Sequence, residues 1–577
     1  MSKTPLGWAA RNGHEGVVEI LLTRDDIDPN KPGEDGRTPL LLAARNGHEG
    51  VVRMLLGWDD IDPDKPDNRG RTPLMGAMRN GHEGVAKMLL ERDDVNPDQR
   101  DGYGRTPLWW AAHYGHEGVV EILLGRDDID PNKPGGDYGQ TPLLRATCDG
   151  HEGVVKMLLG RDDIDPNKPG RGGETPLWAS AWNGDEEVVK MLLRRHDIDS
   201  DKPDDDGKTP LMGAMRNRHE GVVKMLLERD DINPNQPDEN GQTPLLRATC
   251  HGDEGVVKML LGRNDIDPDK PDNRGQTPLI GAMRIEHEGV VKMLLERDDI
   301  NPDQQNGYGQ TPLWWAAHYG HEGVVEILLG RDDIDPNKPS QDGETPLGAS
   351  AWNGDEEVVK MLLRRHDIDP DKPDDYGKTP LMGAMRNRHE GVVKMLLERD
   401  DINPDQPDEN GRTPLLRATC NGDEGVVKML LGRDDIDPNK PGQDGETPLG
   451  VSAWNGDEEV VKMLLGRHDI DPDKPDNQGR TPLWWAACKG EAGVVKMLLG
   501  RDDVNPEKPD TLGKGPLRCA AENGQEGVVE ILLRRGGVNP DKLDNQGLTA
   551  LSSAYRNGHT RVVALLQTLA ATTHSSD

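Results

Sequence analysis

The sequence predicts an all-α solenoid of about 17 helix-turn-helix repeats with protruding loops, and three observations support this prediction. The tripeptide Thr-Pro-Leu recurs along the chain at a spacing of 34 residues, with a single spacing of 35. A segment that begins at Trp109 returns unchanged from Trp314. Apolar residues occupy the same few places in every copy. A fixed period of this length is typical of stacked repeats, in which each repeat contacts only its neighbours.

The Thr-Pro-Leu positions divide nearly all of the 577 residues into seventeen repeats. We therefore expect one continuous array over residues 1–577, with a polar tail over residues 570–577, rather than several domains. The longer spacing falls at the loop "PGGDYGQ", which holds one extra residue. The repeats, numbered 1 to 17, begin at Thr4, Thr38, Thr72, Thr106, Thr141, Thr175, Thr209, Thr243, Thr277, Thr311, Thr345, Thr379, Thr413, Thr447, Thr481 and, in two degenerate copies, Gly515 and Thr549.

Composition alone would suggest a chain close to the boundary of disorder. The chain is 30% charged, carries a formal net charge of −35 and lacks phenylalanine, and its mean hydropathy is −0.78. Low hydrophobicity with high net charge is typical of disordered segments. The fixed placement of the apolar residues outweighs this argument, because every repeat offers the same buried positions to its neighbours.

The first helix of a repeat is predicted from its ends, as the copy at Thr38 illustrates. Thr38 is a good N-cap, and Pro39 suits the first helical position because no hydrogen bond needs its missing N–H. Ala43 and Ala44 lie on one face and are small enough for a second helix to pack closely. Gly47 suits the left-handed residue that ends a helix.

The second helix is predicted to open at His48 and Glu49, where an acidic side chain meets the positive end of the helix dipole. Its length, like that of the first helix, is about 9 or 10 residues, which is too short for a stable isolated helix. Stacking on neighbouring repeats is therefore required. The expected buried stripe comprises Val51, Val52, Met54, Leu55 and Leu56.

The loop "DDIDPDKPDNRG" then stops helix formation, since its prolines, aspartates and asparagine favour turns. Its one expected buried anchor is Ile61. The alternate aspartates resemble a calcium loop, but Lys65 and Pro63 occupy positions that an EF-hand loop needs for glycine and for flexible backbone. We therefore interpret the loop as a solvated turn and expect no metal site.

Together these residues resemble the ankyrin repeat, whose usual pattern is G-x-TPLHxAAxxGHxxVVxxLL followed by a loop. The matches in the second copy are Gly36, "TPL", Ala43-Ala44, Gly47-His48, Val51-Val52 and Leu55-Leu56. The resemblance covers all seventeen repeats and is most like the long ankyrin arrays of fungi. It implies recognition of other proteins, in some family members as the module that accompanies a nucleotide-binding switch domain.

Two departures from that pattern carry structural expectations. The histidine of TPLH, which hydrogen-bonds neighbouring repeats in the family, is missing throughout, so cohesion between repeats is expected to depend more on apolar contact. The glycine that ends the first helix is replaced by Arg218, Glu286 and Arg388. A left-handed conformation costs a non-glycine residue on the order of 1 kcal/mol, so these positions are expected to be weak seams.

No enzyme constellation is present in the sequence, and we expect neither catalysis nor a cofactor. There is no phosphate-binding glycine loop, nucleophile elbow, CxxC or HExxH. The histidines of successive repeats are about 8–10 Å apart, too far to share a metal. The net charge of −35 argues against nucleic acid, which requires a basic stripe, and favours basic partners.

The cysteines and the lack of a signal segment suggest a reducing compartment. Four of the five cysteines occupy one position of the repeat, where the expected spacing of neighbours exceeds the reach of a disulfide. No apolar run approaches the roughly 20 residues of a membrane span. We expect a monomer in the cytoplasm, with the nucleus also open, that binds no membrane.

The variable surface lies at two places, four and seven residues after the first threonine, which line the inner, concave face in the ankyrin arrangement. Tryptophan and arginine, which dominate binding hot spots, are frequent there. Two interpretations stay open: these side chains contact a partner, or the tryptophans pack between neighbouring repeats. The candidates are Trp8, Trp110, Trp182, Trp315, Trp352, Trp454, Trp485, Arg145, Arg216, Arg247, Arg284, Arg386 and Arg417.

The function predicted from the sequence is a non-catalytic scaffold or recognition array that binds an unknown protein partner on its concave face. Two alternatives remain. The chain is the sensor part of a larger signalling protein whose switch domain is absent, or it is a structural or cation-binding array that acts through its aspartate-rich loops.

Overall fold

The computed structural model describes residues 4–284 and 286–573, and the fold is an all-α ankyrin-type solenoid of helix pairs. The contacts divide the chain into two units, Met1–Ile300 and Asn301–Asp577, which are described separately. The prediction of one continuous array over residues 1–577 therefore stays a prediction. The described residues contain 34 helices and no strand. The polar tail predicted for residues 570–577 lies outside the described side chains.

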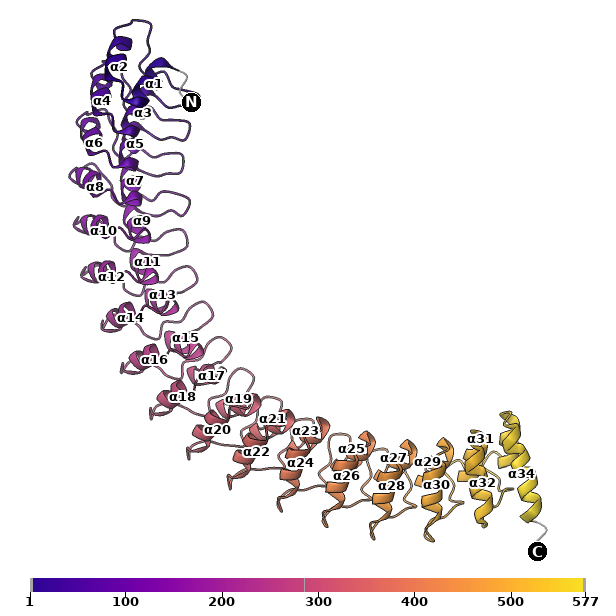
Figure 1. Cartoon of the computed structure of the whole chain (residues 1–577). Helices are drawn as coiled ribbons and strands as arrows, with labels where there is room; N and C mark the ends of the chain where they lie inside the picture. The colour runs from indigo at the N-terminus through magenta and orange to yellow at the C-terminus, as the bar shows by residue number, and fades with distance from the viewer. Residues whose placement is uncertain (1–3, 285, 574–577) are drawn as a thin grey trace. The chain divides into compact units, whose positions relative to one another are not determined.

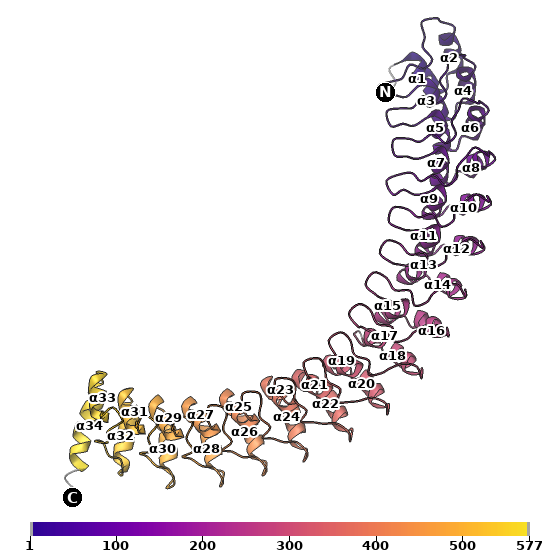
Figure 2. The same ribbon diagram turned by 180° about the vertical axis from the view of Figure 1, so that it is seen from behind.

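In the first unit, the odd-numbered helices form one row and the even-numbered helices a second row beside it (Figures 1 and 2). The odd-numbered helices are α1 (Pro5–Asn12), α3 (Pro39–Asn46), α5 (Pro73–Asn80), α7 (Pro107–Tyr114), α9 (Pro142–Cys148), α11 (Pro176–Asn183), α13 (Pro210–Arg216), α15 (Pro244–His251) and α17 (Pro278–Met283). The even-numbered helices are α2 (Glu15–Leu22), α4 (Glu49–Leu56), α6 (Glu83–Leu90), α8 (Glu117–Leu124), α10 (Glu152–Leu159), α12 (Glu186–Leu193), α14 (Glu220–Leu227), α16 (Glu254–Leu261) and α18 (Glu288–Leu295).

The second unit repeats the arrangement with sixteen helices. Its odd-numbered helices are α19 (Pro312–Tyr319), α21 (Pro346–Asn353), α23 (Pro380–Arg386), α25 (Pro414–Asn421), α27 (Pro448–Asn455), α29 (Pro482–Lys489), α31 (Pro516–Glu522) and α33 (Ala550–Arg556). Its even-numbered helices are α20 (Glu322–Leu329), α22 (Glu356–Leu363), α24 (Glu390–Leu397), α26 (Glu424–Leu431), α28 (Glu458–Leu465), α30 (Ala492–Leu499), α32 (Glu526–Arg535) and α34 (Thr560–Thr573).

The helix ends form as the sequence predicts. The Thr38 hydroxyl accepts a hydrogen bond of 3.1 Å from the N–H of Leu41, and Gly47 ends the helix in the left-handed conformation. Most helices contain eight residues rather than the expected nine or ten, because the capping residues lie outside the helical segment.

The core follows the predicted stripe in part. Ala43, Ala44, Val51, Val52 and Leu55 are fully buried, and the loop anchor Ile61 is buried as well. Met54 and Leu56 are only half-buried. The three fully buried residues of the second helix recur in most repeats, and each stabilises the stack by about 1.5–3 kcal/mol through burial of apolar area.

The extra residue of repeat 4 is absorbed at the tip of its loop. Gly135 and Gln140 form an isolated bridge, with backbone bonds of 2.9 and 3.0 Å. The equivalent loop one repeat earlier closes between Asp101 and Arg105, one residue shorter. The insertion therefore leaves the helices of both flanking repeats in register.

Hydrogen bonds also join neighbouring repeats, and the expected greater dependence on apolar contact stays a prediction. Where a histidine precedes the second helix it does not cap that helix; in most of these repeats its Nε2 bonds instead to a main-chain carbonyl of the preceding repeat. His48 bonds to Arg11 in this way at 3.0 Å. The same bond joins His82 to Arg45, His116 to Arg79, His151 to His113, His219 to Trp182, His389 to Trp352 and His559 to Glu522.

The three glycine replacements are left-handed, as predicted. Arg218, Glu286 and Arg388 have φ values of 60°, 53° and 62°, and they are the only non-glycine residues with positive φ among those described. That these positions open early on unfolding remains a prediction.

Candidate protein-interaction surface

The candidate side chains gather on one surface of each unit. They belong to the odd-numbered helices, and the hairpin loops extend from this row of helices (Figure 1). We call the surface formed by the odd-numbered helices and these loops the loop-side face. Thr-Pro starts every one of these helices except α31 and α33, so positions four and seven residues later recur at the same place in each.

Exposure divides the candidates into three groups. Trp110 is only 5% exposed and packs against the preceding repeat, whereas Trp8 and Trp454 are 55% and 38% exposed. The half-buried candidates are Trp182, Trp315, Trp352, Trp485, Arg145, Arg247 and Arg417, and the exposed arginines are Arg216, Arg284 and Arg386. The sequence does not distinguish these positions, whereas in the structure their side chains differ in exposed fraction.

In several repeats, the side chain four residues after the first threonine is hydrogen-bonded to a buried aspartate. This aspartate lies nine residues earlier, at the base of the preceding loop. The Trp485 indole N–H donates to Asp476 Oδ2 at 3.3 Å. Arg417 donates to Asp408 Oδ2 at 2.8 and 2.5 Å. The same spacing joins Trp110 to Asp101 at 3.3 Å and Arg247 to Asp238 at 3.2 Å. This link ties the helix to its loop, so the polar atoms of these candidates are already engaged.

The charge of Asp408 depends on this link. Burial alone would raise the pKa of Asp408, but bonds from the Arg412 main chain and the Arg417 guanidinium lower it below the usual range. The carboxylate is therefore ionised at neutral pH, and Arg417 neutralises it.

Arg145 follows a different pattern. It forms an ion pair with Asp149, one turn later in the same repeat, and His113 Nδ1 lies 2.8 Å from the same carboxylate. The guanidinium is thus held at the junction of repeats 4 and 5.

The tryptophan seven residues after the first threonine of a repeat is stacked by a cation from the next repeat. The Arg216 guanidinium lies 5.4 Å from the Trp182 ring centre, and that of Arg386 lies 5.2 Å from Trp352. Lys489 lies 3.7 Å from the ring centre of Trp454. Such contacts contribute about 0.5–1 kcal/mol at exposed sites and join neighbouring repeats. These rings therefore have a packing role. Where a ring is exposed, the face opposite the cation is available for contact with a partner.

An open pocket of about 460 Å³ lies on the loop-side face of repeats 13 to 15. Trp454 and Trp485 form its apolar wall, with ring centres 4.3 Å apart and planes at 90°. Lys474 and Asp444 line its loop side. The Lys474 ammonium group makes no hydrogen bond or ion pair with any residue that the structure describes, whereas the equivalent Lys508 donates to the Asp473 carbonyl at 2.7 Å. The pocket therefore offers an apolar wall and an uncommitted cation.

Gly450 lines the pocket at the position at which repeat 15 has Trp484. A Cβ at Gly450 would lie 3.2 Å from the Thr447 hydroxyl and 4.0 Å from Trp485. A larger side chain would extend into the opening. Sequence analysis missed this site, although the change from "TPLW" to "TPLG" is a visible signal of lost volume.

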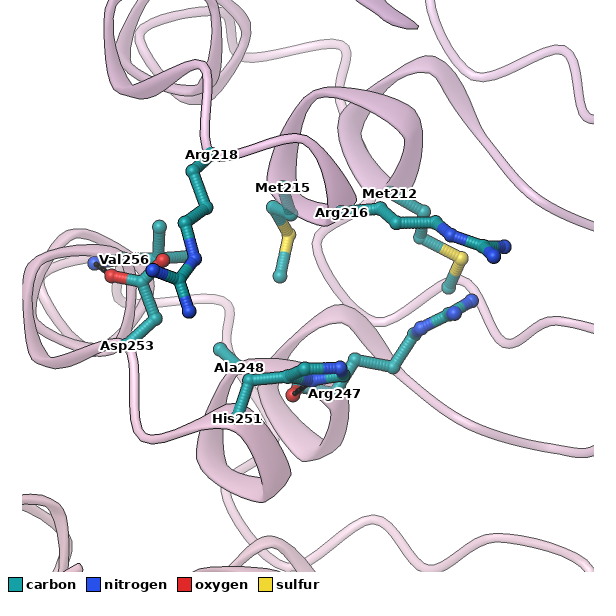
Figure 3. Close-up of a pocket in the computed structure, with 9 residues that line it drawn as sticks. All are labelled: Met212, Met215, Arg216, Arg218, Arg247, Ala248, His251, Asp253 and Val256. Atoms are coloured by element: carbon teal, nitrogen blue, oxygen red, sulfur yellow. Dashed lines mark hydrogen bonds between the residues drawn. The ribbon is translucent and has the colours of Figure 1, made fainter.

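A second, smaller cavity of about 40 Å³ marks the seam at Arg218 (Figure 3). Arg218 extends toward the start of α16, where Asp253 and Val256 lie, and Met215 faces the opening. This volume is too small for a ligand much larger than water.

Two of the three seams coincide with a change in the next repeat, whereas Glu286 is still followed by His321. Where glycine ends the first helix, an added Cβ would clash with the histidine of the next repeat. At Gly184, for example, such a Cβ would lie 2.5 Å from the His219 ring. Arg218 and Arg388 are instead followed by Asp253 and Asp423 at the histidine position. These aspartates cap their own helices, each with a bond of 3.2 Å.

The cysteines are free thiols, and two of them lie close together. Asn523 Nδ2 lies 3.3 Å from the Cys488 sulfur and 3.6 Å from that of Cys519. Burial raises the pKa of Cys148 to about 11, so that this thiol is protonated at neutral pH. Across residues 4–284 and 286–573, no group of three or more His, Cys, Asp or Glu side chains is arranged to hold a metal.

The family follows from the sequence match and the helix pairs together. Overlapping matches to the family model described as "Ankyrin repeats (3 copies)" run from residue 1 to residue 577. The chain belongs to the ankyrin repeat family. Ankyrin arrays are typically protein–protein interaction modules and usually non-catalytic, and the matches identify no catalytic domain.

Solved structures also resemble the chain. One is the ankyrin repeat domain of Bcl-3, described as a unique member of the IκB protein family, with 25% identity over 39% of this chain and 99% of that one, at a TM-score of 0.35. No curated protein matches the chain. The narrower likeness to fungal arrays finds no support in these matches. No helix in the described part of the chain is both long and apolar enough to cross a membrane.

Proposed function

We propose that this ankyrin array is a non-catalytic recognition scaffold that binds a protein partner on its loop-side face, and that repeats 13 to 15 form the principal contact. The pocket beside Trp454 and Trp485 carries this proposal. Ankyrin repeats are typically interaction modules, and tryptophan is strongly enriched among interface residues whose truncation costs 2 kcal/mol or more.

The chemistry of the pocket indicates what part of a partner it accepts. Two orthogonal indoles favour an apolar or aromatic side chain, because edge-to-face contact adds to the burial of area. Lys474 provides a donor for a carbonyl or carboxylate of the same segment, and Asp444 a partner for a basic group. An extended peptide segment with an apolar side chain between polar groups fits this arrangement.

The remaining candidates are proposed as a wider, weaker contact surface along the same face. Trp8, Arg216, Arg284 and Arg386 are exposed to a partner, although Arg216 and Arg386 also stack on tryptophans, whereas buried Trp110 acts through packing. We further propose that the array acts as a monomer in a reducing compartment, and that its charge of −35 favours basic partners by steering their approach.

The test is a footprint of the bound partner. The tagged chain captures partners from a cell lysate, and hydrogen exchange is then measured on the purified complex. We expect slowed exchange in residues 444–454 and 474–485, with α28 and α30 unchanged. Protection confined to the even-numbered helices would contradict the proposal.

A further inference from the structure

The loops of neighbouring repeats are joined by a ladder of side-chain bonds, and one residue per repeat forms each link. This link residue is the third residue of segments such as "DPNKP", "DPDKP" and "NPDQP"; it follows a proline except at Asp201, which follows Ser200. Where it is asparagine, it makes two bonds to the next loop. Asn167 accepts from the Asp199 N–H at 2.8 Å and donates to the Asp197 carbonyl at 2.6 Å. Asn30, Asn132, Asn235, Asn337 and Asn439 make the same pair of bonds.

Where the link residue is aspartate, half of this arrangement is missing. Asp201 Oδ2 accepts from the Asn233 N–H at 2.5 Å, in the place of the asparagine oxygen. Asp201 Oδ1 is fully buried and has no hydrogen-bond partner. The same division between a bonded and an unpartnered oxygen occurs at Asp64, Asp98, Asp303, Asp371, Asp405 and Asp473.

The unpartnered oxygen occupies the place of a donor. In the asparagine links the amide nitrogen donates to the carbonyl of the aspartate that precedes the loop isoleucine, and in the same register Asp231 is the residue that corresponds to this acceptor for Asp201. An ionised carboxylate there would direct an acceptor at an acceptor, which is costly in a buried position. A proton on Oδ1 would turn it into the missing donor.

We propose that a subset of the aspartate links, Asp64, Asp201 and Asp371, are proton-operated contacts between repeats that close on mild acidification and loosen at neutral pH. These three differ from Asp98, Asp303, Asp405 and Asp473 in one facing residue, although burial raises the pKa of Asp303, Asp405 and Asp473 as well. The next loop carries Gln99, Gln236 or Gln406 at the position where the loops facing Asp98, Asp303, Asp405 and Asp473 carry a lysine. Lys133, for example, lies 2.6 Å from Asp98 and supplies a permanent positive charge there.

The surroundings of these carboxyls agree with a proton at mildly acidic pH. Burial raises the pKa of Asp201 to about 6, Asp199 and Asp231 raise it further, and the Asn233 N–H and Arg263 oppose the rise. Burial likewise raises the pKa of Asp371, which faces the Asn403 N–H, Asp369, Asp401 and Arg433, and of Asp64, which faces the Asn96 N–H, Asp62 and Asp94.

The sign of the effect follows from linkage. Because the folded-state pKa is raised, the folded chain holds extra protons between the ordinary aspartate pKa, about 4, and about 6 for Asp201. The stabilisation is complete below this window and is lost as the pH rises through it. The Arg–Asp pairs at the loop starts act in the opposite sense, since Arg365 lowers the pKa of Asp367 to about 2.

The chain itself offers the variant that tests the proposal, since asparagine is native at the same position in six other repeats. The full-length triple variant Asp64→Asn, Asp201→Asn, Asp371→Asn makes the links permanent. Its matched control, Asp93→Asn, Asp230→Asn, Asp400→Asn, removes the same number of charges at exposed positions of the facing loops. Amide exchange of Asn96, Asn233 and Asn403, corrected for intrinsic rates, reports on each link at pH 7.5 and 5.5.

In the wild-type chain and the control, we expect corrected exchange at these amides to slow at least threefold between pH 7.5 and 5.5. In the triple variant, exchange should be slow at both values. The reverse change, Asn167→Asp together with Lys202→Gln, should create the same pH response at the Asp199 amide.

Three results would overturn the proposal. The triple variant could keep the wild-type pH response, or the control could lose it, in which case general charge rather than the link is responsible. Protection at pH 7.5 that rises with millimolar Mg²⁺ or Ca²⁺ and does not respond to acid would assign the buried oxygens to a cation instead of a proton.

Discussion

The indole nitrogen of Trp110 lies 3.3 Å from the buried carboxylate of Asp101, and the same bond joins Trp485 to Asp476. Repeat 10 has the same pair of tryptophans, but its loop carries Asn306 in place of the aspartate. Asn306 bonds to Gln310 at 2.9 Å, and the buried Trp315 Nε1 has no partner. One repeat thus lacks a bond that its two counterparts have.

Copying the counterpart into repeat 10 should stabilise it. We expect the double variant Asn306→Asp, Gln310→Arg, which reproduces the Asp476–Arg480 pair, to raise the local free energy of opening by about 1 kcal/mol, because a buried donor gains its acceptor. Hydrogen exchange of α19 measures this. Equal or faster exchange in the variant would show that the unpartnered indole costs nothing.

Removing the arginine partner of a buried carboxylate should have the opposite effect. Arg417→Ala leaves Asp408 buried without its guanidinium, which should cost about 1–3 kcal/mol at pH 7. The folded-state pKa of Asp408 is lowered, so its contribution is present above the ordinary aspartate pKa and is lost as the pH falls.

The cost of Arg417→Ala should therefore shrink as the pH falls below about 4. Local exchange in α25, compared at pH 7 and pH 3.5, is the measurement. The double variant Arg417→Ala, Asp408→Asn is its control and should recover most of the loss at pH 7. A loss that is the same at both pH values would indicate that packing, not charge, is responsible.

The seam at Arg218 makes a further prediction. Arg218→Gly should stabilise repeats 7 and 8 by on the order of 1 kcal/mol, because glycine adopts positive φ without strain. Asp253→His in the wild-type background should destabilise the same repeats, since the ring would meet the Cβ of Arg218. Native-state hydrogen exchange across α13 to α16 measures both effects. Equal protection in the wild type and in both variants would show that Arg218 does not weaken these repeats.

Variants in repeats 10 and 11 distinguish residues that contact a partner from residues that only affect its approach. If a partner docks there, Trp315→Ala with Trp352→Ala should weaken binding more than tenfold while the circular dichroism spectrum stays nearly unchanged. Asp332→Asn with Asp333→Asn should alter mainly the dependence of the association rate on salt. Faster exchange throughout α19 and α21 in the tryptophan variant would instead identify both residues as packing residues.

The repeat, the helix pair and the strained seams could be predicted because they depend on local chemistry. Caps such as Thr38 and Gly47 act within one turn, and their effect is visible in the sequence of a single repeat. The bonds of His48 and Asn167 could not be predicted, because they depend on the register between neighbouring repeats. The status of Trp110 and Trp454 differs because their neighbours differ, although both positions look equivalent in the sequence.

The candidate pocket shows the same limit. Gly450 signals lost volume, but only the structure places Trp454 and Trp485 at right angles around the resulting space. The dissociation constant of a purified partner for the Trp454→Ala, Trp485→Ala variant tests the central claim most directly, with Lys462→Ala, Lys496→Ala on the even-numbered helices of the same repeats as the control. We predict a rise of at least tenfold for the tryptophan pair and less than twofold for the lysine pair. Equal affinities, or a larger loss for the lysine pair, would contradict recognition on the loop-side face.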